Sequence, residues 1–180
     1  MSKFVRTFQW GIALSGVAVL LAFLTGAWMG SSEEAIREGW KAAAQPVLAT
    51  LWGNDPAKLE AIIGTSWTCL MRAHIHWAGI GAATLVMSAI LSRTNVAMWY
   101  KQAASIFMGI GAIFYPISWL MVANNLALLG KAAAKASGHT YAVIGVGTVM
   151  AGTLMFFGAL IYQSIKDNNS AENFTKVSAK

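Results

Sequence analysis

The residues best suited to chemistry lie in the stretch TCLMRAHIHWAGIG (residues 68–81). Within an otherwise apolar segment it contains Cys69, Arg72, His74 and His76. An arginine costs about 2.5–3.5 kcal/mol at the centre of a bilayer and less near the end of a span. Because ionisable side chains inside membrane segments mark functional sites by default, this stretch indicates a binding or redox site.

Helical geometry separates the two neighbouring histidines. Residues two apart differ by about 200° around a helix axis, so His74 and His76 point in nearly opposite directions. His76 shares its face with Cys69 and Arg72, whereas His74 shares its face with Met71. We therefore expect His76 to be the buried ligand and His74 to belong to a second site.

The third histidine, His139, begins the last apolar run and is expected at a similar depth. A b-type haem held between helices commonly takes axial histidines from facing helices. His76 and His139 could supply them, with His74 as the substitute. Arg72 would then pair with the haem propionates, together with the lysines of the last connection, Lys131 and Lys135.

Three other interpretations of these polar residues stay open. The acceptable copper ligands are His74, His76, His139, Cys69 and Met71. A quinone pocket would use a histidine, the Asn124–Asn125 pair and the aromatic residues Tyr115 or Trp119. Neutral histidines also bond across helices, with about 0.6 kcal/mol each. Covalent c-type haem is excluded because the chain has no C-x-x-C-H motif, and no H-E-x-x-H or phosphate-loop motif supports a hydrolase.

The elements that must position these residues are membrane spans. Of the 180 residues 57% are hydrophobic and 11% are charged, and the charges lie in short blocks between long apolar runs. Each run reaches the roughly 20 residues that cross hydrocarbon. The four runs cover residues 9–29, 67–91, 97–129 and 141–165. We predict an all-α, polytopic membrane protein that folds as a four-transmembrane-helix bundle in the lipid bilayer.

The bundle is expected to form one domain over residues 1–166, followed by a polar cytoplasmic tail at 167–180. Residues 30–66 are predicted to form a helical extracytoplasmic loop, because apolar residues recur there at helical spacing after a serine cap. Small residues four apart, as in Gly26–Gly30 and Gly147–Ala151, indicate close helix packing.

Basic residues set the predicted orientation. Lys3, Arg6, Arg93, Lys101 and Lys166 all fall on one side of the four spans. By the positive-inside rule that side is the cytoplasm, so both termini are cytoplasmic and the pattern fits a bacterial inner membrane. The net charge of +6 does not indicate nucleic-acid binding, because the cations lie at span ends without interleaved aromatic residues.

The string MRAHIHWAGIG resembles the haem-ligand helix of the haem–copper oxidase and nitric oxide reductase catalytic subunits. It is also similar to small four-helix membrane b-type cytochromes, in which one helix begins A-H-x-H and continues to glycine. The resemblance implies that Arg72 lies on the approach to a haem whose iron is bound by His74 or His76. It covers only this string, and an oxidase centre needs more histidines than the three present here.

The chain therefore cannot reduce oxygen by itself. The expected function is electron transfer by haem b near the extracytoplasmic face, as an electron-transfer or accessory subunit of a larger redox complex rather than a stand-alone enzyme. The alternative is a non-catalytic membrane subunit, or a copper-binding one, that packs against partner chains or copies of itself.

Overall fold

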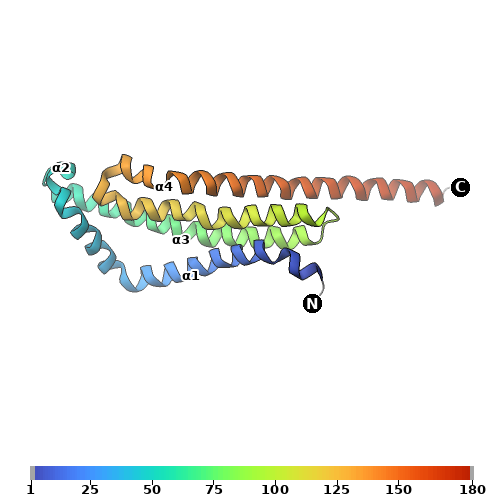
Figure 1. Ribbon diagram of the computed structural model, residues 1–180, viewed down its shortest axis with the longest axis horizontal. Helices are drawn as coiled ribbons and strands as arrows, with labels where there is room; N and C mark the ends of the chain where they lie inside the picture. Colours follow the sequence, from blue (N-terminus) through green and yellow to red (C-terminus); the bar gives the residue numbers. More distant parts are fainter. Residues whose placement is uncertain (1–2, 179–180) are drawn as a thin grey trace.

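The computed structural model describes the backbone of residues 3–178 and the side chains of residues 10–169. In chain order it contains α1 (Lys3–Ala44), the short 3-10 helix η1 (Gln45–Val47), α2 (Leu48–Trp52), α3 (Pro56–Ser92) and α4 (Met98–Ser178). In Figure 1 the long helices lie side by side, with α2 at one end and both termini toward the other. The all-α prediction is confirmed.

The number of membrane-spanning helices differs from the prediction. Three described helices are long and apolar enough to cross a membrane: Trp10–Trp52, Pro56–Ser92 and Met98–Asn169. Apart from residue 97, the predicted runs 97–129 and 141–165 both fall within the last of them, so the predicted count of four is not matched.

Gly130 divides α4 into two arms. Its backbone angles (φ 76°, ψ 171°) leave the helical region for one that glycine adopts without steric cost. In Figure 1 the chain reverses at this point, and the second arm (residues 131–178) runs back along the first arm (residues 98–129). The sequence-based runs therefore correspond to the two arms of one interrupted helix.

Glycines bring the two arms of α4 into close contact. A Cβ placed on Gly145 would lie 2.3 Å from the backbone nitrogen of Tyr115, and one on Gly138 would lie 2.6 Å from the carbonyl oxygen of Ser118. A Cβ on Gly111 would lie 2.5 Å from the Cβ of Val149. Only glycine permits this approach, so we call these contacts the glycine seam.

The predicted outer loop is helical, but its helices merge with the spans. α1 bends at Ser32, whose φ of −136° and ψ of 22° are not helical, and continues to Ala44. α3 begins at Pro56 rather than near Trp67, because the carboxylate of Asp55 accepts hydrogen bonds from the backbone nitrogens of Ala57 and Lys58.

Residues 33–52 form a segment that we call the lid. Two of its tryptophans bind it to the first arm of α4 by hydrogen bonds. The indole nitrogen of Trp40 donates to Oδ1 of Asn124 over 3.2 Å, and that of Trp52 donates to the carbonyl oxygen of Ala127 over 2.9 Å. Trp40 is also part of a buried apolar cluster that joins α1, α3 and α4. The lid is therefore packed against the end of the helices.

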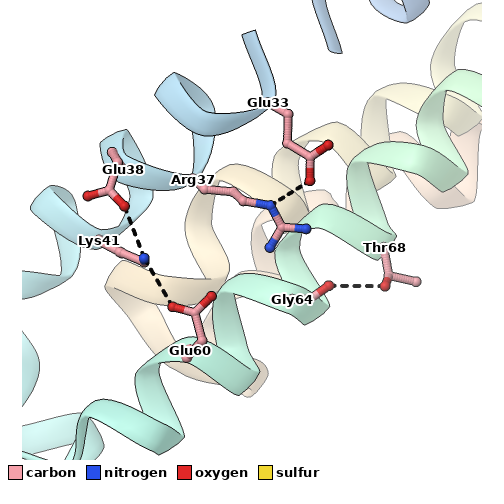
Figure 2. Close-up of polar contacts among 7 residues, drawn as sticks. All are labelled: Glu33, Arg37, Glu38, Lys41, Glu60, Gly64 and Thr68. Carbon is pink, nitrogen blue, oxygen red and sulfur yellow. Dashed lines mark hydrogen bonds and ion pairs between the residues drawn. The ribbon is translucent and has the colours of Figure 1, made fainter. Parts of the chain in front are cut away.

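Ion pairs line the outside of the lid (Figure 2). Arg37 contacts Glu33 over 2.8 Å, and Lys41 bridges Glu38 and Glu60 over 3.0 and 3.1 Å. The hydrogen bonds to Glu38 and then Glu60 raise the pKa of Lys41 above its ordinary value, so this side chain keeps its charge. Exposed pairs contribute about 0–1 kcal/mol each, so buried Trp40 and partly buried Trp52 are the stronger attachment.

At the opposite end, Lys101 closes the turn between α3 and α4. Its side chain is buried, with 5% exposed, and its ammonium donates to the carbonyl oxygens of Ser92 and Thr94. Ser92 is the last residue of α3 and Thr94 lies just beyond it, so both carbonyls lack helical partners. Lys101, on which the predicted orientation partly rests, is thus a helix cap. The side chains of Lys3 and Arg6, which carry part of the orientation prediction, lie outside the described residues.

Candidate functional site

His74 joins α3 to α1. Its Nδ1 lies 2.9 Å from the carbonyl oxygen of Ala22. Since a carbonyl oxygen only accepts, Nδ1 carries the proton and donates it. Gly26 makes room for the ring, because a Cβ there would lie 2.8 Å from His74 Cε1.

His76 faces the first arm of α4. Its Nδ1 donates to the carbonyl oxygen of Arg72 over 2.6 Å. The ring meets Tyr115 edge-on, with centroids 5.0 Å apart, and stacks on Trp119 at 6.4 Å. With Nδ1 engaged by a backbone carbonyl, Nε2 keeps its lone pair, which is the arrangement found in metal-bound histidines.

The candidate site is a pocket of about 470 Å³. Its walls are formed by α3 and by the two arms of α4. α3 contributes Thr65, Cys69 and Arg72, and the first arm contributes Ser118, Trp119, Val122 and Leu126. The second arm contributes Lys131, Lys135, Gly138, His139 and Ala142. The pocket lies at the end of the helices that carries the lid.

The pocket has an excess of positive charge. Arg72, Lys131 and Lys135 line it, its lining contains no carboxylate, and none of the three forms an ion pair within residues 10–169. The Arg72 guanidinium lies 4.8 Å from the centre of the Trp119 ring, a cation–π distance.

Trp119 adds an unused donor. Its buried indole nitrogen has no hydrogen-bond partner among the described residues. Buried donors are normally satisfied, so this nitrogen, together with the cations, favours an anionic ligand.

The structure brings together part of the predicted site. Arg72, Cys69 and His139 share the pocket, and His76 contacts its Trp119 wall from one helical turn below Arg72. His74 lies at the α1 contact instead.

The five predicted copper ligands do not come together at one site. Met71 is 40% exposed and does not line the pocket. Within the described residues no three His, Cys, Asp or Glu side chains converge so that they could hold a metal ion.

The asparagine pair considered for a quinone site is engaged in packing. Asn124 accepts from Trp40 of the lid. Asn125 donates to the carbonyl oxygen of Met121 and, over 3.1 Å, to the hydroxyl of Ser137 on the second arm. Neither lines the pocket.

Gly26→Ala tests the assignment of His74 to the α1–α3 contact. The added methyl group would displace the His74 ring, and the hydrogen bond to Ala22 would be lost. We expect destabilisation of about 1–3 kcal/mol, as for overpacked cores, measured by unfolding in mixed detergent micelles. Gly30→Ala is the control, because no described atom lies within 4 Å of a Cβ at that position. Equal stability of the two variants would contradict the packing role.

The fold defines the class: an all-helical protein whose described part includes three helices long and apolar enough to cross a membrane. No protein-family model, curated protein or solved structure matches the chain.

Proposed function

We propose that this is an integral membrane protein that binds haem b in the pocket at the lid end and transfers electrons near the extracytoplasmic face. The observation that carries the proposal is the pocket itself, which combines the imidazole of His139, three cations without carboxylate partners and an apolar wall. Haem b matches this lining, because it is a flat apolar ring with carboxylates along one edge.

Four membrane crossings are part of the proposal. The reversal at Gly130 gives α4 two antiparallel arms, and both termini point away from the lid (Figure 1). With Arg93 and Lys101 at the turn between α3 and α4, the positive-inside rule places that end in the cytoplasm, in the manner of a bacterial inner-membrane protein.

Haem needs few protein ligands, since the porphyrin itself fills four positions on the iron. His139 lies in the pocket lining and would bind the haem iron; His76, which contacts the Trp119 wall from α3 and has its Nδ1 bonded to the carbonyl oxygen of Arg72, would offer its Nε2 as a further ligand. Arg72 and Lys135 are placed to bind propionates by charge-assisted hydrogen bonds, and Trp119 offers a further donor. When bound, the haem iron supplies a one-electron couple.

A reduced-minus-oxidised absorption spectrum tests the proposal. We expect the protein purified from cells supplied with a haem precursor to show a Soret band and a sharp α-band on reduction. Pyridine haemochrome analysis should then identify haem b. A colourless preparation from these cells would contradict the proposal, and metal analysis of the same sample would detect copper.

The second candidate is a non-catalytic membrane subunit. The hydrogen bond from His74 to Ala22 and the close fit against Gly26 favour it, because both give a histidine a purely structural role. In that case the partner is another membrane chain or a second copy, and the purified protein carries no chromophore.

A further inference from the structure

We call the pocket proposed to bind haem the cofactor pocket. A second pocket, of about 330 Å³, lies beside it at the lid end. It is enclosed by α2, the first turns of α3 and the residue after Gly130, and it shares Thr65 and Lys131 with the cofactor pocket. Leu51, Trp52 and Ile62 give it an apolar wall, and Lys58 stands at its edge. We call it the rim pocket.

One hydrogen bond and one turn of the chain hold the walls of the rim pocket in place. Trp52 ties α2 to the first arm of α4 through its bond to Ala127, over 2.9 Å. The positive φ of Gly130 lets the chain turn there, next to Leu51, and brings Lys131 to the pocket. The cations and the apolar wall are therefore held together by elements from three parts of the chain.

The two lysines of the rim pocket are poorly neutralised. Lys58 has 67% of its side chain exposed, and its contact with Oδ2 of Asp55 is 3.8 Å long. The other oxygen of Asp55 accepts from the first turn of α3. Lys131 forms no ion pair within residues 10–169. Lys41 of the lid, by contrast, is held between two carboxylates.

We propose that the rim pocket binds the phosphate of an anionic phospholipid headgroup between Lys58 and Lys131. Cations beside an apolar wall suit a ligand that is charged at one end and apolar at the other. Tryptophans such as Trp52 are typical of the membrane–water interface, where headgroups lie. Basic residues at the proposed extracytoplasmic end run against the positive-inside rule, and a bound anionic lipid accounts for them.

Native mass spectrometry of the detergent-solubilised protein tests this proposal. Phosphatidylglycerol, phosphatidylcholine and inorganic phosphate are titrated separately. We expect phosphatidylglycerol to bind in preference to phosphatidylcholine. Lys58→Gln and Lys131→Gln should each weaken phosphatidylglycerol binding by about five-fold, since each cation near an anionic headgroup contributes about that factor.

Lys41→Gln is the matched control, because this lysine is at the same end of the molecule but outside the rim pocket. The lipid proposal is overturned if the wild-type protein shows no preference, if Lys58→Gln binds as the wild type does, or if inorganic phosphate competes as well as the lipid. Lys58 does not line the cofactor pocket, so a change in lipid binding without a change in the absorption spectrum separates the two proposals.

Discussion

His139→Ala is expected to abolish the Soret and α-bands of the protein purified from cells supplied with haem precursor. His139 is the histidine that lines the pocket, on the arm that faces α3. Without it no histidine would line the pocket, because His76 lies on α3 outside the lining and contacts only its Trp119 wall. The measurement is the absorbance ratio of Soret band to protein, compared with the wild type.

The matched control is His74→Ala. This variant removes an imidazole from the same membrane region, but one that contacts Ala22 on α1 rather than the pocket. It should keep both bands and lose only stability. If His139→Ala keeps both bands, or if a folded His74→Ala protein loses them, the iron ligands are not the ones that we propose.

His76→Ala separates the two proposed ligands. Its Nδ1 is already bonded to Arg72, so only Nε2 is available to iron. With His139 still in place, we expect haem to bind more weakly and the α-band to shift. An unchanged spectrum would remove His76 from the ligand set and leave it as part of the aromatic stack with Trp119.

Much of the helical arrangement follows from the sequence alone. Hydropathy located the apolar runs, and the turn at Gly130 lies between the runs predicted at 97–129 and 141–165. The sequence predicts a connecting loop between these two runs, whereas in the structure one glycine outside helical geometry is enough to reverse the chain. The rotation of about 100° per residue correctly assigned His74 and His76 to different faces, because that angle depends only on local geometry.

Local sequence patterns could not predict the contacts between residues that lie far apart in the chain. The partner of His74 is the carbonyl of Ala22, fifty-two positions away, and no periodicity identifies it. The pocket depends on how α3 and the second arm of α4 are both placed beside the first arm, so that Arg72 and Lys135 line the same pocket. The spacing of small residues was also an incomplete guide: Gly147 meets no described atom within 4 Å, whereas Gly145 lies in the glycine seam.

Gly145→Ala is expected to cause the largest loss of stability among single methyl additions on the second arm. A Cβ there would lie 2.3 Å from the nitrogen and 2.6 Å from the Cα of Tyr115, which are backbone atoms of a packed helix and cannot rotate away. The arms must therefore separate. Overpacking of this kind costs about 1–3 kcal/mol and occasionally more, measured by unfolding in mixed detergent micelles.

Gly147→Ala is the control for the glycine seam, two residues along the same helix. Its Cβ would meet no described atom within 4 Å, and alanine favours a helix by up to about 1 kcal/mol over glycine, so stability should stay constant or rise. Because Gly138 and Ser118 belong to both the seam and the pocket lining, separation of the arms should also widen the pocket. Gly145→Ala is thus expected to weaken haem binding although position 145 does not line the site. Equal stability and equal haem content in the two variants would show that the seam does not set the position of His139.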